Sequence, residues 1–315
     1  MNARFASIAV VGAGAVGSYY GGLLARAGHG VTLIGRAAHV DAIARDGLRL
    51  ESAGAVETVR VAATTELAAA RGADLVLVCV KSGQTEATAR ALAPLLAPGA
   101  IVASLQNGVE NAQTLARHLS QTVVPAVVYA AIELTAPGTV RHLGGGALVI
   151  GALDAKPDAD TQTALRELAA LFATAGVAVT VSEDVTAELW RKLAVNCAYN
   201  AVSGLTQATY RELAALPDVR ALQQAAAREV IAVAEASGVS LSPDMVLAAI
   251  ERIAATMPAQ RSSTAQDMAR RRRSEIDHLN GFVVRRGREL GVPTPVNATL
   301  YALVKLAEAG YGGGG

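Results

Sequence analysis

Cysteine is scarce in this chain of 315 residues, which contains only two, Cys79 and Cys197. A disulfide framework needs several pairs of cysteines in a short secreted chain. Neither cysteine lies in a C-x-x-C motif or in a cluster with histidines, which is the usual pattern of a metal site. We therefore expect reduced, buried thiols, a cytoplasmic location and no bound metal.

The chain also lacks an excess of either positive or negative charge. The 28 Lys and Arg residues nearly balance 27 Asp and Glu residues, which leaves a formal net charge of +1. A protein with so small a net charge creates no strong overall electrostatic field. We therefore expect neither a nucleic-acid partner nor binding to an anionic membrane. The run Arg270–Arg273 does not change this, because four consecutive residues of a helix point in all directions. Hydrophobic residues make up 52% of the chain, which excludes disorder and, at this length, indicates about two domains.

One segment without charge, Ile8–Ala25, is long enough to resemble a membrane span. Its five glycines argue against a helix that faces lipid, so we expect no membrane partner. We predict instead a strand at Ser7–Val11, a glycine-rich turn, a helix at Ser18–Ala27 and a second strand at Gly30–Ile34. This βαβ unit carries Gly-x-Gly-x-x-Gly at its first turn, which is the fingerprint of dinucleotide binding.

Each glycine of the fingerprint has its own physical reason. Gly12 permits the tight turn, Gly14 lets the backbone approach a pyrophosphate, and Gly17 lets helix and strand pack closely. The helix N-terminus adds N–H groups and a positive dipole end for the phosphates. A glycine-rich turn that binds no ligand is the alternative.

The end of the second strand indicates which dinucleotide is bound. Proteins that prefer NAD carry an Asp or Glu there, which binds the ribose 2′-hydroxyl. This chain has Gly35-Arg36 and no acidic residue before Asp41. The guanidinium of Arg36 can pair with a 2′-phosphate, so we predict NADP, as NADPH, rather than NAD. The alternative is an arginine that faces solvent in a βα loop.

Further strands are predicted at Asp74–Val80, Ala100–Leu105 and Val123–Ala131, with the continuous apolar character of parallel sheets. Lys81 and Asn107 follow the first two of these strands. Both residues are therefore expected at the carboxyl edge of the sheet, where open α/β folds bind their ligands. For the pair Asn107-Gly108 a simple turn is the alternative.

The end of the first domain is predicted from a short antiparallel pair, Gly138–His142 and Ala147–Gly151, which extends the sheet. A helix at Thr161–Ala175 and a strand at Val177–Val181 follow. We therefore predict an α/β fold with an N-terminal Rossmann-type parallel sheet domain, residues 1–183.

The remaining residues, 184–315, show almost no period-2 alternation and are predicted to be all-α, with breaks at Ser203-Gly204 and at several prolines. Lys192, Asn196 and Asn200 lie at i, i+4 and i+8 on one face of a largely apolar helix. Such a stripe must reach water in a cleft or find polar partners. A partly exposed stripe without chemistry is the alternative.

A second helix start is predicted at Ser262–Asp267, where Ser263 and Gln266 form a capping-box pattern. A long helix is expected to follow it. On that helix Glu275 shares a row with three apolar residues, Met268, Leu279 and Phe282. A carboxylate on an apolar row is either paired or part of a site. The last residues, Tyr311–Gly315, are expected to be flexible.

These motifs together resemble the ketopantoate reductase (2-dehydropantoate 2-reductase) family along nearly the whole chain. The matching stretches run from residues 12–17 through the Lys192 helix to the segment Glu275-Ile-Asp-His-Leu-Asn-Gly281, and the last two are the more specific ones. The resemblance implies a Rossmann domain followed by an all-α domain like that of 6-phosphogluconate dehydrogenases, with the active site in the cleft between them. Such enzymes use NADPH to reduce the C2 ketone of ketopantoate to D-pantoate in pantothenate biosynthesis.

The resemblance also implies a role for each matched residue. Lys192 is the catalytic lysine. The residues implied to contact the substrate are Asn107, Lys192, Asn196, Asn200 and Ser263. The residues implied to serve the cofactor are Gly12, Ala13, Gly14, Ala15, Val16, Gly17, Arg36, Lys81, Asn107, Ala131 and Glu275.

The chemistry of these residue types agrees with the implied roles. Hydride transfer to a ketone builds negative charge on the oxygen, which a lysine can neutralise while it donates a proton. Partial desolvation lowers the pKa of a lysine such as Lys192 towards the working range. The amides of Asn196 and Asn200 can bind a hydroxyl or a carboxylate, and Ser263 at a helix N-terminus can bind the carboxylate.

Two positions depart from the family pattern, since Gln260 and Tyr210 stand where relatives often carry asparagines. Both lie on the substrate side, so another 2-oxo acid or an imine is an alternative substrate. A nucleotide-sensing Rossmann protein without turnover is a third hypothesis, although a sensor needs no aligned proton donor such as Lys192. A homodimer through the Ala-rich helices is compatible with the sequence, as is an ordinary helical core.

Overall fold

The computed structural model describes residues 4–311 of the chain. They divide into two compact units, an N-terminal unit that ends at Val185 and a C-terminal unit that begins at Thr186. The predicted flexible end beyond Tyr311 lies outside the described residues. Within residues 4–311, none of the helices combines the length and the apolar character that crossing a membrane requires.

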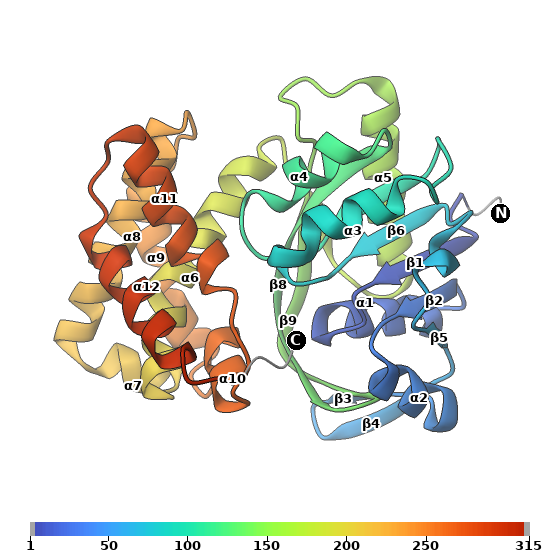
Figure 1. Cartoon of the computed structure of the whole chain (residues 1–315), viewed down its shortest axis with the longest axis horizontal. Coiled ribbons are helices and arrows are strands. Elements are labelled where there is room, and N and C mark those ends of the chain that lie inside the picture. The colour runs from blue at the N-terminus through green and yellow to red at the C-terminus, as the bar shows by residue number, and fades with distance from the viewer. Residues whose placement is uncertain (1–3, 312–315) are drawn as a thin grey trace. The chain divides into compact units, whose positions relative to one another are not determined.

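The N-terminal unit is built on one mixed, mainly parallel sheet of ten strands in the order β4-β3-β9-β8-β7-β6-β1-β2-β5, with β10 paired to β9 (Figure 1). Among the described residues, β8 pairs antiparallel with β9 and β3 antiparallel with β4, and the other strand pairs are parallel. The strands are β1 Ser7–Val11, β2 Gly30–Ile34, β3 Leu48–Ser52, β4 Ala55–Val59, β5 Ala62–Thr64, β6 Leu75–Val78, β7 Ile101–Ser104, β8 Thr122–Ala136, β9 Thr139–Ile150 and β10 Val179–Val181.

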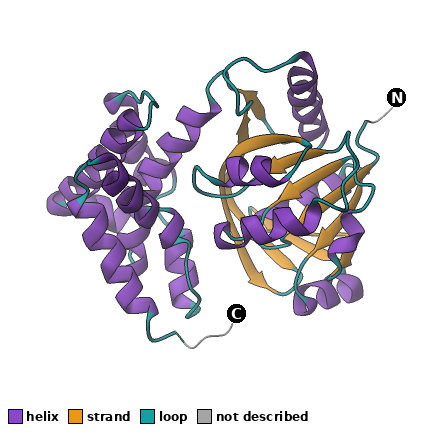
Figure 2. Ribbon diagram, turned by 45° about the horizontal axis from the view of Figure 1, so that its top comes forward, coloured by secondary structure: helices purple, strands orange, loops and turns teal. Residues whose placement is uncertain are grey.

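Helices cover both faces of this sheet (Figure 2). They are α1 Ala15–Arg26, α2 Ala37–Asp46, α3 Thr85–Leu92, α4 Asn111–His118 and α5 Ala159–Thr174, with two 3-10 turns, η1 Leu67–Ala70 and η2 Ser82–Gln84. Alternate residues of β1 point to opposite faces. Ile8 and Val10 belong to the buried cluster that includes α1 and α5, whereas Ala9 and Val11 belong to the cluster that includes α3 and α4. This two-sided burial explains the continuous apolar strands of the sequence.

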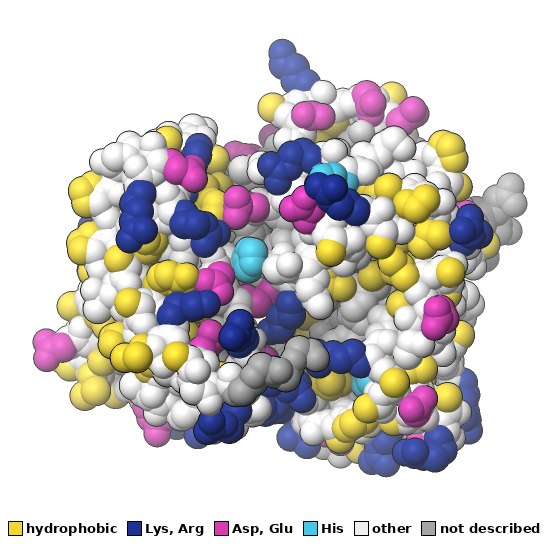
Figure 3. Space-filling model, in the orientation of Figure 1, with side chains coloured by type: hydrophobic (Ala, Val, Ile, Leu, Met, Phe, Trp, Pro, Cys, Tyr) yellow, Lys and Arg dark blue, Asp and Glu magenta, His cyan; other side chains and the backbone are white. Residues whose placement is uncertain are grey.

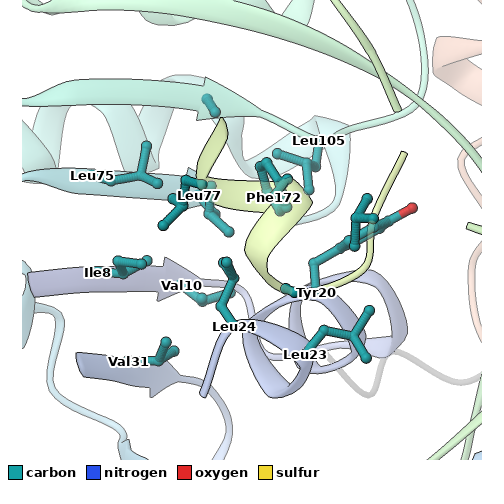
Figure 4. Packing of buried hydrophobic residues seen from close by; sticks show 14 of the residues in the cluster. Ile8, Val10, Tyr20, Leu23, Leu24, Val31, Leu75, Leu77, Leu105 and Phe172 are labelled. Atoms are coloured by element: carbon teal, nitrogen blue, oxygen red, sulfur yellow. The ribbon is translucent and has the colours of Figure 1, made fainter. Parts of the chain in front are cut away.

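Helix α1 is held against the sheet by its large apolar side chains (Figure 4). Tyr20 and Leu24 are fully buried, and complete burial of such a side chain is worth about 1.5–3 kcal/mol. The ring of Tyr20 meets Phe172 of α5 edge-on at 5.9 Å. Its hydroxyl donates to the carbonyl of Gly146 on β9 at 3.1 Å. The helix that begins at the glycine fingerprint is therefore fixed both to the core and to strand β9.

Most predicted elements of this unit are confirmed, and β1 and β2 have the predicted bounds. The predicted antiparallel pair at 138–142 and 147–151 is wrong, because both segments belong to the single strand β9, whose antiparallel partner is β8. The glycines between them, Gly144–Gly146, all have positive φ and coincide with irregular register against Ala130 and Ala131. They form a bulge in one strand rather than a turn between two.

The C-terminal unit contains only helices within residues 186–311, as predicted (Figure 2). They are α6 Val185–Thr206, α7 Tyr210–Ala215, α8 Pro217–Ala236, α9 Pro243–Thr256, α10 Ser263–Ala269, η3 Ile276–His278, α11 Asn280–Leu290 and α12 Pro295–Glu308. The predicted break at Ser203-Gly204 is wrong, because α6 continues to Thr206. A Cβ on Gly204 would lie 2.8 Å from atoms of both Thr264 and Met268, so this glycine serves a close helix contact.

The predicted long helix after Ser262 is also wrong. Helix α10 ends at Ala269, and the N–H groups of Arg271 and Arg272 bond the carbonyls of Met268 and Asp267. Arg271 has a positive φ of 51°, so the helix ends in a Schellman motif without the usual glycine. The arginine run therefore lies beyond the helix, and Glu275 is not on a helical row but directly precedes η3.

A buried histidine joins three elements of the N-terminal unit. Nδ1 of His39 on α2 accepts the N–H of Gly138 in the β8–β9 turn at 2.8 Å. Nε2 therefore carries the proton and donates to Oγ of Ser18 on α1 at 2.9 Å. Burial lowers the pKa of His39, and protonation of Nδ1 would remove the bond from Gly138.

We predict that this histidine makes the stability of the N-terminal unit depend on pH. The folded pKa lies below the ordinary 6.5, so the stabilisation is complete above that pH and is lost as pH falls through the folded pKa. His39→Gln should lower the melting temperature in alkaline buffer, because a lost hydrogen bond costs ~1 kcal/mol of unfolding free energy. The melting temperature of this variant should also depend less on pH in the acid range. Circular dichroism measures both, with His142→Gln as the control. An unchanged acid slope in His39→Gln would contradict the prediction.

Candidate functional site

The glycine turn between β1 and α1 is shaped by contacts that leave no room for side chains at two positions. Gly12 has a φ of +99°, and a Cβ there would lie 2.6 Å from the backbone nitrogen of Val80. A Cβ on Gly17 would overlap the carbonyl oxygen of Gly12 and lie 3.0 Å from Val10. At Gly14, by contrast, a Cβ would meet no atom within 4 Å. The backbone at Gly14 therefore faces open space that a ligand could approach.

The first turn of α1 offers backbone donors to this space. Gly14 is the N-cap and supplies no side-chain hydrogen bond, and no acidic residue lies in the first turn. The helical hydrogen-bond pattern starts with the N–H of Ser18 and the carbonyl of Gly14, so the N–H groups of Ala15, Val16 and Gly17 precede it. Such a helix start favours an anion, above all a phosphate.

Arg36 lies next to this turn at the end of β2. It is the exposed N-cap residue of α2, and a Cβ on its neighbour Gly35 would lie 2.8 Å from Cβ of Ala13. Several Lys and Arg side chains gather over the region of α2, β3 and β4 (Figure 3). Close to Asp46 at the end of α2, the hydrogen bond from Arg45 and the charges of Arg49 and Arg60 lower the pKa of the carboxyl. The basic side chains near the end of α2 thus favour a negatively charged group there.

Lys81 and Asn107 follow adjacent parallel strands, since β6 pairs with β7. Lys81 is the N-cap residue of η2, and Asn107 lies in the loop before α4. Ser82 donates from Oγ to the carbonyl of Asn107 at 3.0 Å. The structure therefore brings the two predicted residues to one edge of the sheet, in loops that are bonded to each other. Ala131 is buried on β8 opposite Gly144.

A buried polar network that the sequence reasoning missed holds these two loops. Nδ2 of Asn111 donates to the carbonyl of Asn107 at 2.6 Å and to Oγ of Ser82 at 3.1 Å. Its Oδ1 accepts the hydroxyl of Thr85 at 2.7 Å. Nε2 of Gln106 donates to the carbonyl of Val80 at 3.0 Å and to Oγ1 of Thr85 at 2.7 Å. The side chains of Ser82, Thr85, Gln106 and Asn111 all form hydrogen bonds in this network, which makes the two loops rigid.

The stripe of Lys192, Asn196 and Asn200 lies on α6 as predicted. Asn200 is buried, and the other two are half-buried. Burial lowers the pKa of Lys192 to about 8, against the opposing effect of the negative charge of Glu275. The C-terminal unit therefore brings Lys192 and Glu275 into electrostatic contact, although Glu275 reaches this place from a loop and not from the predicted helix.

The start of α10 is hydrogen-bonded to α6 at Asn200, the last residue of the polar stripe. Ser262, rather than the predicted Ser263, is the N-cap residue, and its Oγ accepts the N–H of Ala265 at 3.0 Å. The hydroxyl of Ser262 also donates to the carbonyl of Asn200 at 3.3 Å, and its N–H donates to Oγ of Ser203 at 3.2 Å. Ser263 follows as an exposed residue. Asn200 and Ser263 are therefore neighbours within one unit.

The two positions that depart from the family pattern are bonded to each other. The N–H of Tyr210 donates to the carbonyl of Gln260 at 2.9 Å. The ring of Tyr210 lies 4.8 Å from that of Tyr199. Gln260 precedes Ser262 by two residues, so an aromatic pair stands close to the junction between α6 and α10.

The buried network predicts the effect of removing one of its members. Asn111→Leu removes the two bonds that Asn111 donates, to the carbonyl of Asn107 and to Oγ of Ser82, and the one that it accepts from Thr85, each of which contributes about 0.5–1.5 kcal/mol. We expect lower stability, and faster amide exchange in residues 80–86 and 106–112 than in β1 and α1, measured by hydrogen–deuterium exchange. The exposed neighbour Gln113→Leu is the control. Equal exchange in the two variants would refute the positioning role.

Comparison with protein families covers both units of the chain. Residues 8–155 match the model described as ketopantoate reductase PanE/ApbA, and residues 184–308 match that described as ketopantoate reductase PanE/ApbA C terminal. The 2-dehydropantoate 2-reductase of Halobacterium salinarum is 37% identical to this chain, over 96% of this chain and 98% of its own length. That of Mycobacterium tuberculosis is 33% identical over 97% of this chain and 99% of its own.

Solved structures are also similar to this chain over nearly its whole length. A ketopantoate reductase of the PanE/ApbA family from Ralstonia eutropha is 54% identical, with a TM-score of 0.88, over 96% of this chain and 98% of that one. A D-mandelate dehydrogenase bound to NADH and anilino(oxo)acetate is 26% identical, also with a TM-score of 0.88, over 96% of this chain and 98% of that one.

Proposed function

The chain belongs to the ketopantoate reductase family, and on that basis we propose that it reduces the C2 ketone of 2-dehydropantoate with NADPH to form D-pantoate, a step of pantothenate biosynthesis. The observation that carries the proposal is the half-buried Lys192 on α6, whose pKa is lowered by burial to about 8. Ketone reduction needs a proton donor whose pKa lies near the working pH. Asn196 and Asn200 continue the same face and supply amide groups for the substrate.

The residues of the N-terminal unit fit a nicotinamide dinucleotide. The open space at Gly14 and the backbone donors of α1 suit its pyrophosphate, and Arg36 suits a 2′-phosphate. When bound, NADPH supplies the hydride. We assign the cofactor to these residues: Gly12, Ala13, Gly14, Ala15, Val16, Gly17, Arg36, Lys81, Asn107, Ala131 and, from the C-terminal unit, Glu275.

Lys192 has the central chemical role in this proposal. Negative charge that develops on the ketone oxygen is stabilised by the ammonium group, which then donates its proton to that oxygen. At neutral pH a lysine with a pKa of about 8 is still mainly protonated, and it loses its proton more readily than an exposed lysine. The hydroxyl of Ser263 and the amides of Asn196 and Asn200 orient the carboxylate and the hydroxyl of the substrate.

A panel of 2-oxo acids tests the function directly. Oxidation of NADPH is followed by absorbance with ketopantoate and with acids of different size and polarity. The proposal predicts the highest kcat/KM for ketopantoate. Tight NADPH binding without turnover of any member would reject the enzyme and favour a nucleotide-sensing protein.

An aryl 2-oxo acid is a second candidate substrate, because Tyr210, which is partly exposed and packs on the buried Tyr199, stands near the α6–α10 junction. An additional ring against Tyr210 would gain about 0.5–1.5 kcal/mol beyond the burial of its area. The similarity to a D-mandelate dehydrogenase supports testing this class. A higher kcat/KM for phenylglyoxylate than for ketopantoate would favour it.

We predict that Lys192→Ala lowers kcat by about 10²–10⁴-fold, the usual contribution of a positioned acid. NADPH affinity should change little, because the dinucleotide is assigned mainly to the N-terminal unit. Stopped-flow single turnovers and fluorescence titration with NADPH measure the two quantities. The exposed Lys156→Ala is the matched control. If Lys192→Ala keeps its activity, the proton-donor assignment is wrong.

We predict that Arg36→Glu weakens NADPH relative to NADH by about 10–100-fold, since a hydrogen bond to a charged group contributes about 1.5–3 kcal/mol. Dissociation constants for both dinucleotides give the ratio. Arg45→Glu reverses another charge on the same helix and is the control. An unchanged ratio in Arg36→Glu would refute recognition of the 2′-phosphate by this residue.

A further inference from the structure

The last helix, α12, presents three polar side chains to the segment that contains Glu275. Tyr301, Lys305 and Glu308 lie at i, i+4 and i+7, which places them on one face of the helix. Each of them binds a residue within two positions of Glu275, either Ser274 or Asp277. The arrangement is unusual for a packing face, where apolar side chains are expected.

Glu308 holds the residue that precedes Glu275. Its side chain is buried, with 3% of its surface exposed. Oε1 accepts both the N–H of Ser274 at 2.8 Å and the hydroxyl of Ser274 at 2.5 Å. Oγ of Ser274 in turn accepts the N–H of Ile276 at 3.3 Å. A buried carboxylate therefore fixes the backbone on both sides of Glu275.

Tyr301 and Lys305 hold the other end of the segment through Asp277. The hydroxyl of Tyr301 donates to Oδ1 of Asp277 at 2.6 Å, and Nζ of Lys305 donates to Oδ2 at 2.8 Å. Burial would raise the pKa of Asp277, but the hydrogen bonds from Lys305 and Tyr301 outweigh it and hold the pKa below its usual value. Arg285 of α11 adds a bond from its guanidinium to the carbonyl of Asp277 at 2.8 Å.

A glycine in α11 makes room for this contact. A Cβ on Gly281 would lie 2.8 Å from the ring of Tyr301 and 3.1 Å from the carbonyl of Ile276. The ring is therefore seated directly against the start of α11. The absence of a side chain at Gly281 lets α11, η3 and α12 meet at one point.

We infer that the polar face of α12 positions Glu275. The bonds from Glu308 to Ser274, and from Tyr301 and Lys305 to Asp277, hold the backbone of residues 274–277 and so set where the Glu275 carboxylate lies relative to Lys192. Tyr301, Lys305 and Glu308 are positioning residues, because they act through Glu275. The inference rests on the roles proposed above for Glu275 and Lys192.

The consequence is electrostatic. The negative charge of Glu275 raises the pKa of Lys192 against the effect of burial, so a displaced Glu275 leaves the lysine with a lower pKa. On its own helix, Lys192 has Glu188 one turn away, in an ion pair with Arg191. The other charged or titratable groups around the Glu275 segment include Arg273, directly before it in the chain, and Asp277, His278, Arg285, Tyr301, Lys305 and Glu308.

The test compares Glu308→Leu with Glu308→Gln. The amide oxygen of the second variant can accept the same two bonds from Ser274, whereas leucine can accept neither. We expect Glu308→Leu to lower kcat/KM by about tenfold or more, since a misplacement of ~1 Å can cost about 10²-fold. Its loss of activity at alkaline pH should also begin at a lower pH than in the unmodified enzyme. Glu308→Gln should restore both properties, and the exposed Leu303→Ala should not affect them.

Further variants keep the test decisive. If Glu308→Leu does not fold, Tyr301→Phe combined with Lys305→Met removes the bonds to Asp277 and should give the same shift. A folded Glu308→Leu enzyme with the original pH profile and kcat/KM would overturn the inference. Glu275→Ala is measured in parallel. An unchanged profile in Glu275→Ala would mean that the proposed role of Glu275 itself is wrong, and activity lost only in the α12 variants would mean that α12 acts through another group.

Discussion

The reaction that we propose depends on the cost of keeping one lysine, Lys192, partly out of water. Desolvation disfavours the ammonium form of Lys192 and lowers its pKa to about 8, while the carboxylate of Glu275 opposes that shift. Full exposure would leave the pKa near 10.5, and burial without Glu275 would lower the pKa further than the two effects do together. The balance requires α6 and the loop before η3 to be held in fixed positions.

Buried hydrogen bonds hold α6 in place. Nδ2 of the fully buried Asn280 donates to the carbonyl of Cys197, on the turn between Asn196 and Asn200, and to Oδ1 of Asn297. Glu229 of α8 accepts the N–H groups of Val296 and Asn297, so it caps α12, whose own N-cap residue provides no side-chain bond. The N-terminal unit uses the same principle around Asn111. In both units, side chains assigned to chemistry are positioned by amides and carboxylates that are removed from water.

Sequence patterns correctly predicted the parts of this fold that depend on interactions between residues close together in the chain. Strand β1, the glycine turn and the stripe on α6 follow from apolar periodicity and from the steric demands seen at Gly12 and Gly17. Strand β9 was misread because its glycines form a bulge whose register depends on β8, a partner that no local pattern reveals. The end of α10 was misread because Arg271 adopts a positive φ that sequence rules reserve for glycine. The buried polar networks were missed because single polar residues in apolar segments give no pairing signal.

The pH dependence of kcat for ketone reduction by the unmodified enzyme tests the central claim most directly. If Lys192 donates the proton, kcat should be constant at neutral pH and should fall as pH rises through about 8, by about tenfold for each further pH unit. The oxidation of the hydroxy acid, which needs the neutral amine, should show the opposite trend. A kcat for reduction that stays constant up to the ordinary lysine pKa of 10.5 would contradict the account.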